Sequence, residues 1–209
     1  MKLFESILWK LDKGYFLLDY HLERMERGAV HFGFHFREDA AVEKLKKLSE
    51  DMAAKGINAC KIRMFLDTDG NISFDTEDLA LRAPHGPLRL AVAGEIIHPE
   101  DSFIHFKTTN RDFYEHSTPR SRVEYDDLVF LNTRGELCET TRANIVLKKK
   151  GKFLTPSESS GLLPGTYRAY LLDKGEITEQ TLYETDLLEA DSVFLINSVR
   201  KWMDAVVVK

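Results

Sequence analysis

The side chains most able to do chemistry are those of a lysine and a glutamate that precede a predicted helix start. Lys107 follows the apolar run Phe103-Ile104-His105-Phe106, and Glu139 lies in a polar, turn-rich stretch. The helix start is Pro164-Gly165-Thr166. An amine, a carboxylate and a helix N-terminus are the parts needed to hold an aldehyde cofactor that carries a phosphate, so the pattern indicates carbonyl chemistry at Lys107.

The chemistry expected of Lys107 depends on its packed neighbours. A lysine in a low-dielectric setting loses proton affinity, and its neutral amine can form a Schiff base. An ordinary surface lysine is the alternative. Glu139 could pair with a protonated pyridine nitrogen, which makes the ring an electron sink. An exposed glutamate at a strand end is its alternative.

The helix start near Gly165 could bind a phosphate. Its first backbone N–H groups have no partner within the helix and lie at the positive end of the helix dipole. Ser198 follows an apolar strand and could add a hydroxyl, and Arg24 could add a positive charge. Asn144 is flanked by apolar residues, so its buried amide needs partners, and we favour a turn-fixing role for it.

The composition excludes several classes of protein. The chain has 209 residues with a net charge of −5, so no excess of positive charge indicates binding to nucleic acid or an anionic membrane. We expect no membrane span, no signal peptide and no metal site, because no apolar run or histidine spacing predicts them. Cys60 and Cys138 form no CxxC pair, and we expect free thiols in a reducing cytoplasm.

Hydrophobic periodicity predicts an α/β chain of two domains. The first has helices over residues 19–33 and 39–55, the former with Asp19 as its cap. Its predicted strands are residues 4–9, 14–18, 59–67 and 72–74. Two prolines and a glycine mark a break, so we expect a small N-terminal α/β domain over 1–83 and a linker over 84–87.

The predicted second domain covers residues 88–209 and carries Lys107. Its predicted strands are residues 88–93, 127–132, 138–147, 153–156 and 192–196. Its predicted helices or helical turns are residues 107–116, 165–174 and 186–190. No internal repeat divides it further.

Six sequence blocks, in this order, resemble the class-IV (fold type IV) pyridoxal-phosphate enzymes. They are Phe4-Glu5-Ser6-Ile7-Leu8, His21-Leu22-Glu23-Arg24-Met25, Lys107-Thr108-Thr109-Asn110-Arg111, Glu139-Thr140-Thr141-Arg142-Ala143-Asn144, Gly161-Leu162-Leu163-Pro164-Gly165-Thr166-Tyr167-Arg168 and Asn197-Ser198-Val199-Arg200. The resemblance covers nearly the whole chain. It implies a two-domain α+β fold, with a larger C-terminal pseudo-barrel domain, and a homodimer.

Within that family the chain is most similar to the aminodeoxychorismate lyases, including the lyase module fused to aminodeoxychorismate synthase. Branched-chain aminotransferases tend to have G-T-A-x-E at residues 197–201 and a tyrosine at the position of Asp112. This chain departs from the family in having only three residues before its Phe-Glu strand. It also has Arg142 where aminotransferases often have glycine.

The resemblance also implies roles for individual residues. Lys107 would be the catalytic residue, bound to pyridoxal 5'-phosphate as a Schiff base, and Glu139 would pair with the pyridine nitrogen. The other cofactor-binding residues would be Arg24, Asn144, Thr166, Tyr167 and Ser198. Arg63, Arg111 and Arg142 are candidates for substrate carboxylates, with surface salt bridges as the alternative.

The implied function is conversion of 4-amino-4-deoxychorismate to 4-aminobenzoate and pyruvate, a step of folate biosynthesis in the cytoplasm. Aminodeoxychorismate synthase would act upstream. A class-IV aminotransferase acting on branched-chain or D-amino acids is the first alternative, because it uses the same cofactor residues. A non-catalytic homologue that binds pyridoxal phosphate is the second.

Overall fold

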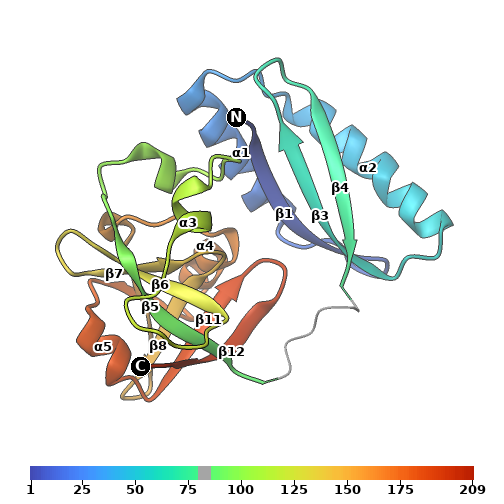
Figure 1. Ribbon diagram of the computed structural model, residues 1–209. Coiled ribbons are helices and arrows are strands. Elements are labelled where there is room, and N and C mark those ends of the chain that lie inside the picture. Colours follow the sequence, from blue (N-terminus) through green and yellow to red (C-terminus); the bar gives the residue numbers. More distant parts are fainter. Residues whose placement is uncertain (80–85) are drawn as a thin grey trace. The chain divides into compact units, whose positions relative to one another are not determined.

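The computed structural model describes residues 1–79 and 86–209, and its contacts divide the chain into two compact units (Figure 1). Unit 1 comprises Met1–Ala83 and Lys107–Asn110, and unit 2 comprises Pro84–Phe106 and Arg111–Lys209. The predicted linker at 84–87 falls partly on residues 80–85, which lie outside the described residues. The domain boundary therefore stays a prediction.

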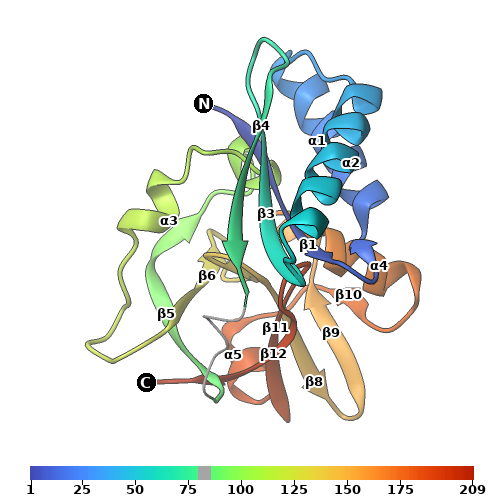
Figure 2. The ribbon, with the colours of Figure 1, turned by 90° about the vertical axis from the view of Figure 1, so that its right-hand side faces the viewer.

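Unit 1 is a four-stranded antiparallel sheet in the order β2-β1-β3-β4, with helices α1 and α2 along one face (Figure 2). Its elements are β1 (Leu3–Lys10), β2 (Gly14–Tyr15), α1 (Leu18–Phe32), α2 (Glu38–Ala54), β3 (Ala59–Leu66) and β4 (Ile72–Asp78). Its core includes Leu22 and Met25 of α1 and Met64 of β3, all buried. This apolar helix face against an alternating sheet is what the sequence pattern predicts.

Two local predictions for unit 1 are wrong. The strand predicted over 14–18 contains only two strand residues, and α1 begins at Leu18. Asp19 therefore lies inside the first helical turn and does not cap it; the cap position is Leu17, whose φ is 55°. The reason is that Leu17 adopts the left-handed conformation, which ends the strand earlier than its hydrophobicity suggests.

Residues 107–110 are held against the start of β1. The N–H of Phe4 donates to the carbonyl of Lys107 (2.9 Å), and the N–H of Thr109 donates to the carbonyl of Lys2 (2.8 Å). This edge of β1 is available because β2 pairs only with its last two residues. These contacts group Lys107 with unit 1, whereas the sequence analysis places it in the predicted C-terminal domain.

Unit 2 is built on an eight-stranded sheet in the order β10-β9-β8-β11-β12-β5-β6-β7. Its strands are β5 (Leu88–Ile97), β6 (Asp127–Asn132), β7 (Leu137–Thr140), β8 (Asn144–Lys149), β9 (Lys152–Pro156), β10 (Thr178–Gln180), β11 (Ser192–Asn197) and β12 (Lys201–Val207). An additional pairing of β8 with β7 makes the sheet barrel-like. The predicted fold class, mixed α/β with a C-terminal pseudo-barrel, is thus confirmed.

The helices of unit 2 are short. They are η1 (Ser102–His105), α3 (Asp112–His116), η2 (Glu158–Ser160), α4 (Thr166–Asp173) and α5 (Glu184–Leu188). The helix predicted over 107–116 therefore begins later, because residues 107–110 pair with β1. Within the described residues, no helix is long and apolar enough to cross a membrane.

The single strand predicted over 138–147 is two strands, β7 and β8, joined by a tight turn. The hydroxyl of Thr140 donates to the carbonyl of Ala143 (3.1 Å) and accepts from its N–H (3.2 Å). A side chain that bonds the local backbone in this way favours a turn over a continuous ladder. The turn lets Glu139 and Asn144 face each other as cross-strand partners.

Candidate active site

A buried cluster in unit 1 joins β1 to α1. Glu5, His21 and Arg24 are 1%, 0% and 6% exposed. Alternation along β1 points Glu5 inward, and the spacing of three residues places His21 and Arg24 on one face of α1. The Glu5 carboxylate accepts from Arg24 Nε (2.8 Å) and Nη2 (2.6 Å) and lies 2.6 Å from His21 Nδ1.

The charges of this cluster are set by burial and by its own members. Burial raises the pKa of Glu5, but Arg24 and His21 outweigh it and lower that pKa from 4.5 to about 2. Burial lowers the pKa of His21, against the influence of Glu5, and the charges of Arg24 and Lys107 lower it further. Neutral His21 therefore donates through Nδ1 to a carboxylate that also binds Arg24.

Lys107 belongs to the same unit as this cluster. Its backbone is fixed against β1, as described above, and its Nζ lies 4.6 Å from the centroid of the Phe4 ring. Lys107 is half-buried, and its positive charge contributes to the lowered pKa of His21. Of the predicted site residues, unit 1 thus contains Lys107 and Arg24 near one histidine, while Arg63 of β3 is exposed.

A second cluster, in unit 2, surrounds Glu139 at the end of β7. Glu139 is 5% exposed. Its Oε1 accepts from the Tyr114 hydroxyl (2.7 Å) and its Oε2 from the N–H of Leu163 (3.2 Å). Burial and the nearby carboxylate raise the pKa of Tyr114, so the phenol stays a donor. Both of these donors are neutral groups.

Asn144 holds the same loop as Glu139. Its Nδ2 donates to the carbonyl of Leu163 (2.9 Å), so the two side chains bind opposite sides of one residue. A Cβ on Gly165 would lie 2.0 Å from Asn144 Oδ1, so any other residue there would force the Asn144 amide to move. The start of α4 is therefore fixed by Glu139 and Asn144 together.

The remaining predicted residues of unit 2 differ in burial. Thr166, Tyr167 and Ser198 are 4%, 7% and 7% exposed. Ser198 follows β11, whose Ile196 pairs with Asn144, so the strand order brings it to the same end of the sheet. Arg142 is exposed.

Arg111 is already engaged within unit 2. Its Nη2 donates to the carbonyl of Thr141 (2.5 Å), and its guanidinium carbon lies 5.0 Å from the centroid of the Tyr114 ring. These contacts orient Tyr114 from one side. Arg111 thus supports the ring that holds Glu139, in addition to being a candidate for a substrate carboxylate.

The sequence analysis did not assign roles to Glu5, His21 or Tyr114. A signal for the first two was present, because Glu5 is a charged residue at an inward position of an alternating strand. Such a residue requires a partner, and two basic residues follow on one helix face. No comparable pattern singles out Tyr114, whose contact with Glu139 depends on how α3 packs.

Nearly the whole chain matches a known family. The model of the family described as amino-transferase class IV matches residues 2–207. This chain belongs to that family. Its members are pyridoxal-phosphate-dependent enzymes, as the resemblance in the sequence implies, so the chain is a class-IV enzyme.

Individual relatives of this class-IV chain include lyases and aminotransferases. A Schizosaccharomyces pombe protein, provisionally named as an aminodeoxychorismate lyase, is 30% identical over 214 residues, covering 99% of this chain and 89% of the relative. A crystal structure of a protein from Mesorhizobium loti, provisionally named as an amino-acid aminotransferase, has a TM-score of 0.88 at 28% identity, with 99% of both chains covered.

A third relative supports the fold. The crystal structure of a Legionella pneumophila protein, provisionally named as a 4-amino-4-deoxychorismate lyase, has a TM-score of 0.83 at 23% identity and covers 99% of this chain and 82% of that one. Proteins with both kinds of name therefore share one fold, and the reaction is set by the residues around the site.

The residue types of the two clusters fit pyridoxal phosphate. Glu139 is a buried carboxylate that two neutral donors orient, which suits a pyridinium nitrogen. Gly165 directly precedes the first turn of α4, whose backbone N–H groups suit a phosphate. Lys107 has an amine and Arg24 a guanidinium, the residue types expected for the aldehyde and the phosphate of this cofactor.

Proposed function

We propose that this class-IV enzyme is a lyase that converts 4-amino-4-deoxychorismate to 4-aminobenzoate and pyruvate. The observation that carries the proposal is the buried Glu139, oriented by Tyr114 and Leu163, in a chain whose relative over 99% of its length is named as such a lyase. Three of its sequence blocks, at residues 107–111, 161–168 and 197–200, support the same choice.

Each proposed role uses a property already described. Bound pyridoxal phosphate would supply an electron sink for the carbon next to the substrate nitrogen. Lys107 Nζ would bind the cofactor and then accept the proton from that ring carbon. Glu139 would hold its negative charge against the pyridine nitrogen, because Tyr114 and the Leu163 N–H fix both of its oxygens.

Four residues are proposed to hold the phosphate. Arg24 would provide the charge, the N–H groups of Thr166 and Tyr167 the helix start, and Ser198 a hydroxyl. Asn144 would act by holding the loop before α4 in place, since its amide bonds the Leu163 carbonyl. We therefore expect substitutions at Gly165, as well as at Arg24, to weaken phosphate binding.

The decisive experiment supplies the purified holoenzyme with 4-amino-4-deoxychorismate. We expect 4-aminobenzoate and pyruvate in equal amounts, and no product from the Lys107→Ala variant. A visible absorbance band that borohydride removes in wild type, and that Lys107→Ala lacks, would separately establish the cofactor. Transfer of an amino group to a 2-oxo acid, with no 4-aminobenzoate formed, would refute the lyase.

An aminotransferase acting on branched-chain or D-amino acids is the second candidate. The Mesorhizobium loti structure favours it, because that protein is provisionally named as an amino-acid aminotransferase and its length matches this chain. In this reaction Lys107 would return the proton to the cofactor. No pyruvate would be eliminated. Assays with branched-chain and D-amino acids, each with a 2-oxo acid, test it directly.

Two further parts of the proposal concern the state of the enzyme in the cell. We expect a homodimer in the cytoplasm, with aminodeoxychorismate synthase supplying the substrate. Sedimentation equilibrium of the holoenzyme tests the dimer, since a single monomeric species at micromolar concentration would exclude it. A protein that binds pyridoxal phosphate but catalyses neither reaction would be the non-catalytic homologue.

A further inference from the structure

Arg200 differs from the other arginines that are at least half-buried in the described part of unit 2. Those arginines each have an acceptor: Arg89 has Asp126, Arg111 has the carbonyl of Thr141, and Arg168 has Glu179. Within the described ranges, no residue accepts a hydrogen bond or an ion pair from the Arg200 guanidinium. A half-buried cation without an anion is costly, so this position calls for a ligand.

The backbone of Arg200 is held in one conformation. It lies in the short loop between β11 and β12, where Asn197 Oδ1 accepts from the N–H groups of Val199 (3.1 Å) and Arg200 (2.8 Å). The loop closes on Lys201, which pairs with Asn197 and has a φ of 60°. A residue other than glycine in the left-handed region is strained, and such strain is concentrated at functional sites.

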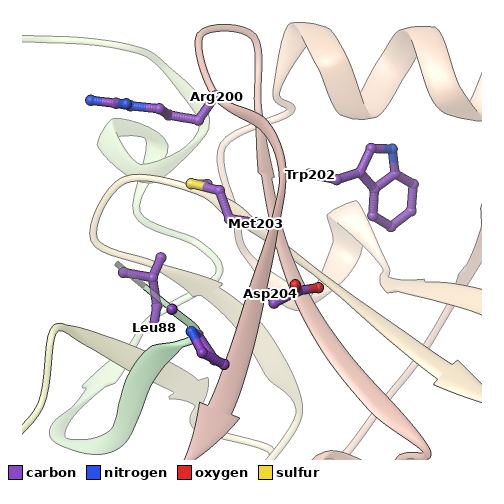
Figure 3. Close-up of a pocket in the computed structure, with 7 residues that line it drawn as sticks. Leu88, Arg200, Trp202, Met203 and Asp204 are labelled. Atoms are coloured by element: carbon purple, nitrogen blue, oxygen red, sulfur yellow. The ribbon is translucent and has the colours of Figure 1, made fainter. Parts of the chain in front are cut away.

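A hollow of ≈ 380 Å³ adjoins this side chain in unit 2. Arg200, Met203 and Leu88 are among the residues that line it. Figure 3 shows Arg200 and Met203 on the side of β12 that faces Leu88, whereas Trp202 and Asp204 project to the opposite side. The Asp204 side chain thus projects away from Arg200, and Met203 and Leu88 contribute apolar side chains on the side of Arg200.

We propose that Arg200 binds a carboxylate of the substrate, and that the apolar wall formed by Met203 and Leu88 receives the body of the molecule. This inference rests on the proposed function, in which the substrate and both products are carboxylates. A planar guanidinium can form two parallel hydrogen bonds with a carboxylate. The site would thus select small carboxylates with an apolar or aromatic body.

The test compares two probes that differ only in charge, 4-aminobenzoate and its neutral amide, by calorimetric titration of the holoenzyme. Wild type should bind the acid roughly 10- to 100-fold more tightly, as expected for charge-assisted hydrogen bonds. Arg200→Met should abolish this preference and raise KM, while Arg200→Lys should keep part of it. Arg122→Met, at an exposed arginine of the same unit, is the matched control and should behave as wild type.

The outcomes separate this inference from the proposed function. An unchanged preference in Arg200→Met, with intact folding and cofactor absorbance, would overturn the inference even if wild type forms 4-aminobenzoate. Loss of the preference in Arg200→Met supports the carboxylate site. If wild type then forms no 4-aminobenzoate, only the proposed reaction fails.

Discussion

Two buried glutamates, one in each unit, are held in opposite ways. Glu5 of unit 1 is bound by the charged guanidinium of Arg24 and by His21. Glu139 of unit 2 accepts instead from a phenol and a peptide N–H. The hydrogen bonds described for the first carboxylate come from a guanidinium and an imidazole, whereas those described for the second come from a phenol and a peptide N–H.

The difference indicates what each carboxylate is for. A buried carboxylate that accepts two hydrogen bonds from one guanidinium fixes the position of that guanidinium, so Glu5 should matter for folding and for the orientation of Arg24. Glu139 is oriented by a phenol and a peptide N–H on its two oxygens, so it should matter for a pyridinium ring. The following predictions test this contrast.

Removal of Glu5 should have the largest effect on stability. Glu5→Ala leaves Arg24 buried without its partner, which should lower the free energy of unfolding by about 3–5 kcal/mol. Urea unfolding monitored by circular dichroism measures it. As the control, Asp39→Ala breaks an exposed pair with Arg37, in which both residues are at least 70% exposed, and should change the free energy of unfolding far less than Glu5→Ala. Similar losses of unfolding free energy in Glu5→Ala and Asp39→Ala would show that the buried ion pair contributes no more than an exposed one.

The pH dependence of stability should show the same ion pair. The pKa of Glu5 is lowered from 4.5 to about 2 in the folded state, so its contribution is fully present above pH 4.5 and is lost as the pH falls towards about 2. The loss should reach roughly 3 kcal/mol. The lowered pKa of His21 acts in the same direction and starts the decline as the pH falls below 6.5.

Glu5→Gln isolates this effect, because the amide does not titrate. Subtraction of its unfolding free energy from that of wild type, measured from pH 7 to pH 3, should give a difference that shrinks at acid pH. A constant difference over this range would show that Glu5 keeps an ordinary pKa.

Tyr114→Phe tests the second carboxylate. It removes one donor from Glu139 and should cost about 1.5–3 kcal/mol, the range for hydrogen bonds to charged groups. If Glu139 serves the cofactor, the variant should also bind pyridoxal phosphate more weakly and shift its visible absorbance. Equilibrium dialysis and absorbance titration measure both. A loss of stability with unchanged cofactor binding would make Tyr114 purely structural.

Gly165→Ala should have the smallest effect of this series, about 1–3 kcal/mol, because the added methyl forces the Asn144 amide to move. The double variant with Asn144→Ala removes the clash. We therefore expect the double variant to be no less stable than Asn144→Ala alone, a non-additivity that a double-mutant cycle measures. Strict additivity would show that the Cβ does not meet Asn144.

The sequence predicts those parts of the fold that follow from periodicity. The strand that contains Ile7, the helix that contains Leu45 and the sheet of β3 and β4 are found where alternation and helical spacing place them. The fold class follows from these elements together with the resemblance. The family match confirms that resemblance, while the roles of Lys107, Glu139 and the phosphate residues stay predictions.

Contacts between distant segments could not be predicted in this way. Lys107 joins unit 1 because β2 leaves part of β1 unpaired, which no local pattern reveals. The bond from Tyr114 to Glu139 depends on how a five-residue helix packs against a strand 25 positions away. Likewise, the finding that no residue in 1–79 or 86–209 accepts from the Arg200 guanidinium requires the placement of its neighbours.

The way residues 107–110 complete unit 1 has a consequence for dissecting the enzyme. The chain passes between the units at residues 83–84, 106–107 and 110–111, so no single cut separates them. A protein divided near residue 84 would leave the first fragment without the segment that pairs with the start of β1. The two fragments should therefore behave as a split protein, in which the second complements the first, and not as autonomous modules.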